Sequence, residues 1–569
     1  MSFYQPWGQE AVRHHAAVAG GKIPPTRILK YAYYLNTSLK KWMTAHIWID
    51  GDRIVYVGER LPDALDLTDT EIVDCSGKYV VPGYIEPHAH PFQLYNPHTL
   101  AAYAAGRGTT TLISDNLPLF IHLNDEESFA FMEKLNEEPV TQLWWCRYDA
   151  QTALRTEPFT TERIKKWLSH PLVVQGGELT SWPQVLHGDD AILEWMLETK
   201  ATGKPIEGHL PGASEKTLTQ MMLLGVDCDH EAMTGEEAWR RITLGLSTSL
   251  RYSSIRPDLP VILKELLERG LRHFERVYMT TDGATPNFYK QGIMDRTIAI
   301  AIEQGVPIED AYMMATVNPA RHYGWQHLIG EIAPGRIAHI NILEAKDQPT
   351  PTSVLAKGQW VKRDGIVMYP EPSFSLKEAL GECHLDWDLT EDMLKVNTSL
   401  GIEMVNAVIT KPFTYNGSDP DIMTVALIDR GGRWRAVSRL KGFARRLGGL
   451  ASSYSSTGDI IVIGTHSSDM ICAFKRMKSI GGGLVLVEDG QIEAELPLPI
   501  AGSVSDQPME ILMDQEATFT KALRECGYPF SDPIYSLLFL SALHLPYIRL
   551  TPMGVVDVMK REVLVPAEI

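Results

Sequence analysis

Residues 79 to about 325 alternate short runs of β-branched and aromatic residues with longer amphipathic stretches. Eight of the short runs are candidate strands: KYVVPGYIEPH, TTTLISD, TQLWWCRYD, PLVVQGGEL, KPIEGHL, VDCDHE, LSTSLRYSS and RVYMTTDG. Strands that alternate strictly with helices form a parallel sheet with the helices outside, and eight such units close into a barrel. The sequence therefore predicts an α/β fold with a (β/α)8 TIM-type barrel over residues 79–330, about the usual 250 residues.

The segments on either side of this region are typical of a second, smaller sheet. RILKYAYYLNTSLKKWMTAHIWIDGDRIVYVGER alternates with a period of two and contains an Asp50-Gly51 turn, which is a hairpin signal. EIAPGRIAHINIL and LAKGQWVKRDGIVMY follow the barrel and have the same pattern. We expect residues 1–78 and 331–370 to pair into one small β-sandwich domain, with the barrel inserted between them.

The last third of the chain has a different character. Residues 371–400 are acidic and mixed in composition and predict a linker. Residues 401–569 combine strand patterns such as DIIVIGT and GGGLVLVEDG with helical ones such as HSSDMICAFKRMKSIG and QEATFTKALRECG. This part is expected to form a third, α+β domain.

The net charge and the cysteines limit the kinds of partner and the cellular location that the protein can have. The chain has 53 Lys and Arg against 71 Asp and Glu, a net charge of −18, which repels nucleic-acid backbones and anionic membrane surfaces. Its six cysteines include no C-x-x-C pair, and no run approaches the roughly 18 apolar residues of a membrane helix. We expect a soluble cytoplasmic protein with no nucleic-acid or membrane partner, whereas an uncharged nucleobase is not excluded.

Metal-capable residues stand at the ends of five of the eight predicted strands. Any one of them alone would be an ordinary polar residue facing water at a strand terminus, and an isolated H-x-H motif is usually no more than that. In a barrel, however, the carboxyl ends of all strands meet around one mouth, which is where active sites form. The predicted ligands from these five strand ends are His88, His90, Glu178, His209, His230 and Asp282.

Four imidazoles and two carboxylates suit zinc, iron, manganese or cobalt better than calcium. Six ligands are more than one open tetrahedral zinc site would use, so the sequence favours two divalent ions with Glu178 bridging them. Such ions lower the pKa of bound water toward about 7 and supply a nucleophile. Asp282 is the first candidate to take the proton of that water and pass it to a leaving group.

These same residues resemble a known family. VVPGYIEPHAH, the Glu178, His209, His230 and Asp282 strand ends, and LIGEIAPGRIAHINIL resemble the amidohydrolase superfamily. IEGHLPGASEKTLTQMMLLGVDCDHE and GTHSSDMICAFKRMKSIGGGLVLVEDGQIEAELPLPIAG are similar to the bacterial adenine deaminase family, including its own C-terminal domain. The likeness covers nearly the whole chain.

The resemblance implies hydrolysis of adenine to hypoxanthine and ammonia, with manganese or iron as the two ions and zinc as an alternative. It carries the six residues over as ligands, with Glu178 in place of the carboxylated lysine of many relatives, and Asp282 as proton shuttle. It also adds Glu231, beside His230, as an acid–base candidate or, equally, a salt-bridge partner. A homodimer or a larger homo-oligomer is the implied assembly, and a purine base the implied small-molecule partner.

The sequence departs from the family pattern where the purine is expected to bind. After the second strand the family reads D-P-H-E, whereas this chain reads SDNLPLF, with Asp115 kept and Leu117 and Pro118 in place of His and Glu. The family loop A-H-D-S-H-N becomes YSSTGD, and its paired aspartates in strand eight become Asp282-Gly283. We expect Asp115, Asn116 and Leu117 to contact the substrate.

An apolar pocket gains from each methyl-sized group that fits it. The changes in SDNLPLF therefore favour an adenine whose amino group carries a small alkyl substituent, such as 6-methyladenine, with methylamine as the product. Two alternatives stay open. One is a cyclic-amide hydrolase of the hydantoinase or dihydropyrimidinase type using the same metal site, and the other is a relative that has kept the fold and lost activity.

Overall fold

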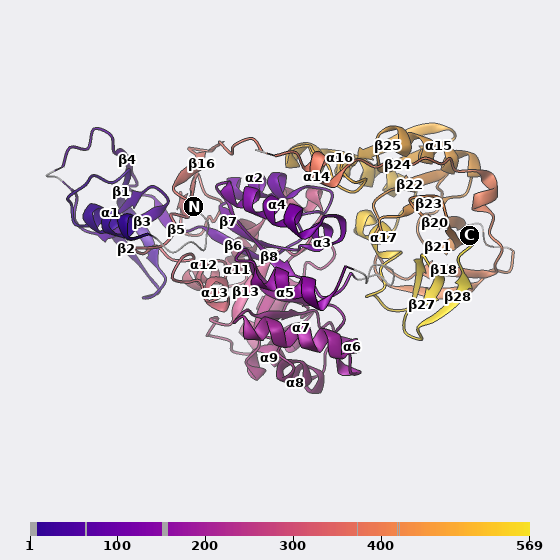
Figure 1. The fold of residues 1–569 in the computed structure, drawn as a ribbon, viewed down its shortest axis with the longest axis horizontal. Helices are drawn as coiled ribbons and strands as arrows, with labels where there is room; N and C mark the ends of the chain where they lie inside the picture. Colours follow the sequence, from indigo (N-terminus) through magenta and orange to yellow (C-terminus); the bar gives the residue numbers. More distant parts are fainter. Residues whose placement is uncertain (1–7, 63–64, 151–157, 373, 418, 420) are drawn as a thin grey trace.

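The computed structural model describes residues 8–62, 65–150, 158–372, 374–417, 419 and 421–569. Its parts lie in a row, with a small β domain at one end, a barrel in the middle and the C-terminal domain at the other end (Figure 1).

A barrel of eight parallel strands forms the centre of the molecule, as the sequence predicts. The strands follow one another in chain order around the sheet. The first and last strands are joined through side chains, because Thr280 Oγ1 lies 3.1 Å from the carbonyl oxygen of His88 and 2.6 Å from the carboxylate of Glu86. The strands are β6 (Tyr84–Ala89), β7 (Thr109–Ser114), β8 (Thr141–Cys146), β9 (Val173–Leu179), β10 (Ile206–Gly208), β11 (Cys228–Asp229), β12 (Ser247–Arg251) and β13 (Val277–Thr280).

The amphipathic stretches between the strands form the outer helices. Local signals fix their ends: Asn124 caps the first turn of one helix through its side chain, and Gly245 ends another in the left-handed conformation, with φ of 89°. The helices predicted from these stretches are α4 (Asp125–Glu137), α5 (Thr161–Ser169), α7 (Asp190–Ala201), α8 (Glu215–Leu223), α9 (Gly235–Leu244) and α10 (Leu259–Glu268).

Further helices cover the rest of the barrel and its rim. They are α2 (Pro97–Gly106), α3 (Leu117–His122), α6 (Trp182–Leu186), α11 (Met294–Glu303), α12 (Ile308–Met313) and α13 (Val317–His322), with a 3-10 turn, η1 (Pro286–Gln291).

The first predicted strand was wrong in one respect, because KYVVPGYIEPH forms two strands in two different sheets. Tyr79–Pro82 is β5 and pairs in the small domain, whereas β6 of the barrel begins at Tyr84. Gly83 lies between them in a crowded place, where a Cβ would come within 2.1 Å of Thr110 Oγ1 and 3.0 Å of His339 Cβ. The chain can change sheets here because glycine leaves room for this close contact.

The flanking segments form one sheet, as expected, in the order β17-β16-β15-β14-β5-β1-β2-β3 with β4 beside β1. Strands from before and after the barrel meet where β5 pairs antiparallel with β14, Ile340 lying opposite Pro82. The sheet curls around its core, since Ile54 of β3 bonds the carbonyl of Arg336 at 2.9 Å. Its strands are β1 (Arg27–Asn36), β2 (Lys41–Asp50), β3 (Arg53–Gly58), β4 (Glu71–Asp74), β5, β14 (Ile340–Leu343), β15 (Ser353–Ala356), β16 (Gln359–Arg363) and β17 (Ile366–Val367), and α1 (Gln9–Ala19) packs on it.

The predicted linker is not free chain over its whole length. It contains α14 (Leu376–Leu380) and a 3-10 turn, η2 (Glu391–Leu394). Leu385, Leu389 and Leu394 are buried in the same apolar core as α15 (Ser467–Ser479). The second half of residues 371–400 therefore belongs to the C-terminal domain, because its leucines are part of that domain's core.

The C-terminal domain is α+β, as predicted, with an eight-stranded sheet in the order β19-β18-β21-β20-β23-β22-β24-β25 and a three-stranded sheet, β26-β27-β28. α17 (Pro533–Phe539) lies on the side that faces the barrel (Figure 1). The other elements are β18 (Leu400–Met404), β19 (Thr410–Thr414), β20 (Ile422–Ile428), β21 (Arg435–Lys441), β22 (Gly449–Ser452), β23 (Ile460–Gly464), β24 (Gly483–Glu488), β25 (Gln491–Pro497), α16 (Met509–Glu525), β26 (Ile548–Thr551), β27 (Gly554–Asp557) and β28 (Glu562–Pro566).

The barrel and the C-terminal domain share one apolar core, which includes Leu94 and Tyr95 of the barrel and Met509 and Ile534 of the C-terminal domain. Backbone bonds cross the same junction, such as Ser505 N to the carbonyl of Leu94 at 2.6 Å. The two domains therefore pack as one unit at the mouth of the barrel. Within the described part of the chain, no helix has the length and apolarity needed to cross a membrane.

Candidate active site at the mouth of the barrel

The six residues predicted as metal ligands come together at one end of the barrel. Three overlapping groups each place ligand atoms within 4.8 Å of one another: His88, His90 and Asp282; His88, Glu178 and His230; and His209, His230 and Glu231. His88 lies on β6 and Glu178 on β9, whereas the others come one or two residues after the strands that carry them. Each of the six belongs to at least one group, and the shared His88 and His230 connect the groups.

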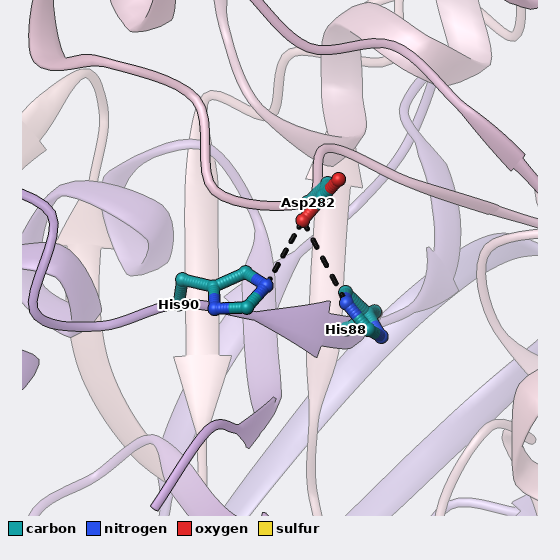
Figure 2. A group of neighbouring side chains, drawn as sticks. All are labelled: His88, His90 and Asp282. Carbon is teal, nitrogen blue, oxygen red and sulfur yellow. Dashed lines mark ion pairs between the residues drawn. The ribbon is translucent and has the colours of Figure 1, made fainter. Parts of the chain in front are cut away.

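The first group lies between the first and last strands of the barrel (Figure 2). One oxygen of Asp282, Oδ1, is 3.0 Å from His90 Nε2 and 3.6 Å from His88 Nε2. Asp282 stands at a positive φ of 53°, a conformation that aspartate tolerates better than most residues. Two imidazole nitrogens and one carboxylate oxygen thus face a common point.

The other two groups share His230. Glu178 Oε1 is in contact with His209 Nδ1 and lies 3.6 Å from His230 Nε2. The imidazoles of His88 and His230 have ring centroids only 4.0 Å apart, which joins this side of the site to the first group. Glu178 also lies close to His88, so its carboxylate stands between the two sides of the cluster.

Unpartnered nitrogens test whether these residues suit a metal. Among the described residues, His88 Nε2 and His230 Nε2 are buried and have no hydrogen-bond partner. Buried polar atoms are nearly always paired, so two such nitrogens facing the same cluster need a ligand. Divalent transition metals are bound by neutral imidazole nitrogens and carboxylates of this kind. The donor set therefore fits metal ions.

Glu207, which the sequence analysis missed, holds the two central histidines. Its Oε2 lies 3.0 Å from His88 Nδ1 and its Oε1 lies 2.9 Å from His230 Nδ1. Burial raises the pKa of Glu207, but its electrostatic interaction with the His88 ring and the hydrogen bonds from both rings outweigh burial and hold the pKa below its ordinary value. An ionised carboxylate on both Nδ1 atoms leaves the Nε2 atoms free to face the metal site. The sequence feature that could have identified Glu207 is its position on strand five, two residues before His209.

Arg147, at the end of strand three, is a second residue that sequence reasoning missed. Its guanidinium binds Asp115 through Nε at 2.9 Å and Nη2 at 2.7 Å, and the same Nη2 lies 2.8 Å from Glu178 Oε2. Asp115 in turn contacts His90 Nδ1 at 3.0 Å. One buried chain of charges, His90–Asp115–Arg147–Glu178, thus connects the two sides of the metal cluster.

Arg251, the last residue of β12, lies between the two acid–base candidates. Its Nη1 is 2.6 Å from Glu231 Oε1 and 2.6 Å from Asp282 Oδ2. Arg256 reaches the other oxygen of Glu231 at 3.2 Å. Burial raises the pKa of Asp282, yet Arg251 and His90 hold it well below its ordinary value. Both oxygens of Glu231 are therefore engaged by arginines, and Asp282 shares one of these arginines.

The residues predicted to contact the substrate have different surroundings. Asp115 and Leu117 line the cavity at the barrel mouth, whereas Asn116 is buried and accepts a bond from the backbone of Arg147 at 3.2 Å. The carboxylate of Asp115 is occupied by Arg147, His90 and the amide of Leu117, at 2.9 Å. These contacts favour a role for Asp115 in orienting His90, and leave Leu117 as the residue of the three that presents an open side chain to the cavity.

The cavity over the candidate metal ligands has a volume of about 260 Å³ and walls from two domains. The barrel wall includes Leu117, Pro118 and Ile121, together with four of the six proposed ligands: His90, Glu178, His209 and Asp282. The C-terminal domain supplies a second wall that includes Tyr454, Tyr535, Leu538, Phe539 and His544. The site is thus a cluster of candidate metal ligands at the barrel mouth, below a chamber lined by both polar and apolar side chains. This is the arrangement of a metal-dependent hydrolase of the amidohydrolase superfamily.

Comparisons with known proteins agree with this class and narrow it. Residues 79–361 match the amidohydrolase family, and residues 401–562 match the adenine deaminase C-terminal domain. The chain is 54% identical to a protein of Halalkalibacterium halodurans named "Putative adenine deaminase", over 99% of this chain and 98% of the relative. It is 27% identical to an adenine deaminase of Moorella thermoacetica, over 97% of each chain. The protein therefore belongs to the adenine deaminase family.

Among solved structures, a β-aspartyl dipeptidase of Fervidobacterium islandicum is similar to part of the chain. The TM-score is 0.48 and the sequence identity 18%, with 61% of this chain and 99% of that chain covered.

Proposed function

We propose that the protein hydrolyses the exocyclic amino group of a 6-aminopurine, converting adenine and water to hypoxanthine and ammonia. The observation that carries this proposal is the overlapping set of metal-ligand groups at the barrel mouth, in a chain of the adenine deaminase family. The related adenine deaminases supply the substrate class, and the chamber above the cluster has room for a small planar base.

In this proposal two divalent ions, manganese or iron with zinc as an alternative, are held by the six predicted ligands. His88, His90 and Asp282 face one position, and His209 and His230 face the other, with Glu178 between them. When bound, two such ions lower the pKa of a water molecule enough to provide a nucleophile near neutral pH.

Asp282 is the proposed proton carrier. Asp282 lines the chamber and belongs to the same ligand group as His88 and His90, so its carboxylate is placed to accept a proton from the attacking water. The same carboxylate can then donate that proton to the departing amine, because it faces the chamber from the rim of the barrel. Glu231 is held by Arg251 and Arg256, and we assign it to fixing these arginines and the neighbouring imidazoles rather than to the first proton transfer.

The apolar side of the chamber favours a purine whose amino group carries a small alkyl substituent. Leu117, Pro118 and Ile121 line this side and offer no side-chain hydrogen-bond partner to a bare amino group. A methyl group that fills such a pocket gains about 1–3 kcal/mol. We therefore propose 6-methyladenine, which would release methylamine, as a preferred substrate.

The test is a comparison of kcat/KM for adenine and 6-methyladenine on protein loaded separately with manganese, iron and zinc. A higher value for 6-methyladenine supports the proposed alkyl preference. An adenine preference of tenfold or more contradicts that preference but leaves the proposed deamination of adenine standing. Product analysis separates the reaction classes: release of ammonia or methylamine supports deamination, whereas a new carboxylate from a dihydropyrimidine or hydantoin would indicate a cyclic-amide hydrolase. Protein that holds well under one ion per chain and cannot be reloaded would indicate an inactive relative.

A homodimer is the proposed assembly. Sedimentation of the metal-loaded protein at several concentrations measures the molar mass directly, and a single species near the 63.7 kDa of one chain contradicts the dimer.

A further inference from the structure

Tyr535 reaches from the C-terminal domain into the active-site chamber. It lies on α17, the helix on the barrel side of that domain (Figure 1), and its side chain is among those that line the chamber. Its backbone amide is bonded to the carboxylate of Asp532 at 3.0 Å, which caps the helix, whereas its hydroxyl is hydrogen-bonded to none of the other described residues. The hydroxyl is thus an available donor and acceptor inside the chamber.

Gly283, next to Asp282, makes room for this hydroxyl. A Cβ on Gly283 would lie 2.7 Å from the hydroxyl oxygen of Tyr535 and 3.0 Å from His90 Cβ. The φ of Gly283 is outside the left-handed region, so its backbone would accept any residue. Glycine is therefore needed here because the hydroxyl of Tyr535 occupies the place that a side chain would take, and not because of the backbone conformation.

Tyr535 is the first of three rings that cross the chamber. Its ring centroid lies 5.2 Å from that of Phe539, Phe539 lies 6.1 Å from His544, and His544 lies 6.1 Å from the proposed ligand His209. These distances are those of aromatic rings in contact. The C-terminal domain thus lays a continuous aromatic wall over the metal cluster, from the Asp282 side to the His209 side.

We propose that Tyr535 is a substrate-positioning residue, which holds the edge of the purine beside Asp282 while the rings of the wall cover its face. The inference deepens the proposed function and rests on it, since it takes a planar 6-aminopurine as the ligand. It also gives the C-terminal domain a role, because the barrel alone would leave this side of the chamber open. A hydroxyl beside Asp282 can hydrogen-bond a ring nitrogen of the base and keep its C6 position toward the carboxylate.

The main test is Tyr535→Phe in the full-length, metal-loaded protein, which removes one oxygen and keeps the ring. We expect KM for the better of adenine and 6-methyladenine to rise at least fivefold while kcat changes less than threefold. The bound metal and the unfolding midpoint should stay at their wild-type values. The matched control is Tyr528→Phe, whose hydroxyl is bonded to Ser536 at 2.6 Å, away from the chamber. This control is expected to lower the unfolding midpoint and leave KM within twofold of wild type.

A second test uses Gly283→Ala alone and combined with Tyr535→Phe. Because the added methyl group would meet the hydroxyl, the single Gly283→Ala variant should lose kcat/KM, and the double variant should lose less than the product of the two single effects by at least threefold. An unchanged KM in Tyr535→Phe, or effects that simply multiply, would overturn the inference while the wild type still deaminates purines. A wild-type protein that deaminates no purine would overturn both the proposed function and this inference.

Discussion

Glu207 Oε1 and His230 Nδ1 lie 2.9 Å apart, deep below the proposed metal site, and the second oxygen of the same carboxylate holds His88. One side chain thus fixes the orientation of two imidazoles from two other strands. Gln175 donates a further bond to Glu207 at 2.8 Å and keeps the carboxylate in place. The orientation of two proposed ligands therefore depends on a residue outside the proposed ligand set.

Glu207→Gln is expected to weaken metal binding by about 10–100-fold, because an amide cannot accept hydrogen bonds from both imidazoles. Elemental analysis after dialysis against a weak chelator measures this loss. Glu215→Gln, at an exposed position on α8, is the control and should retain the wild-type metal content. Equal metal retention by both variants would contradict the assigned role of Glu207.

Leu117→His is expected to lower the preference for an alkylated amine. The substitution replaces an apolar chamber side chain by a polar one, and the ratio of kcat/KM for 6-methyladenine to that for adenine should fall about tenfold. Leu197→His, at a position 60% exposed on α7, serves as the control. A ratio that stays the same in Leu117→His would place the alkyl-binding surface elsewhere.

Arg241→Met is expected to destabilise the protein by about 3–5 kcal/mol, because it leaves a buried carboxylate without its positively charged partner. Arg241 Nε lies 2.6 Å from Asp229 Oδ1, and both side chains are fully buried behind the strand ends that carry His209 and His230. The adjacent Arg240→Met removes only a partly exposed pair with Glu236 and should cost less than about 1 kcal/mol. Urea unfolding of the two variants measures the difference, and similar midpoints would argue against a structural role for the buried pair.

Glu516→Gln is expected to change how stability depends on pH. Burial raises the pKa of Glu516 to about 8, so the folded state holds this proton more tightly than the unfolded chain does. The stabilisation is present below about pH 4.5 and is lost as the pH rises through 8. Relative to wild type, the variant should therefore gain about 2–4 kcal/mol between pH 5 and pH 9.

Unfolding midpoints at these two pH values measure that change. Glu510→Gln, at an exposed position on the same helix, should show the same difference from wild type at both. A constant difference for Glu516→Gln as well would show that Glu516 does not bind a proton on folding.

Much of the barrel could be predicted because its signals are local. Each strand run and each amphipathic helix is readable within about ten residues, and the strand ends then place His88, His230 and the other ligands around one mouth. The division of KYVVPGYIEPH between two sheets could not be read in this way, because it depends on the distant Thr110 and His339 around Gly83.

The supporting residues escaped prediction for the same physical reason. Arg147 and Arg251 stand at strand ends, as the ligands do, but an arginine there becomes informative only when its partners Asp115 and Asp282 are known. Tyr535 and His544 come from a different domain and have no local pattern that points to the chamber. Their role follows from how the two domains pack, which a linear pattern does not contain.

The antiparallel pairing of Pro82 with Ile340 has a consequence for how the molecule is assembled. The chain leaves the small sheet after β5 and returns to it in the neighbouring strand β14. The barrel between these strands is therefore a domain inserted at a single point of the small sheet. Because β5 and β14 pair directly with each other, the small sheet stays continuous across the point of insertion. The small sheet thus holds the start and the end of the barrel segment of the chain next to each other.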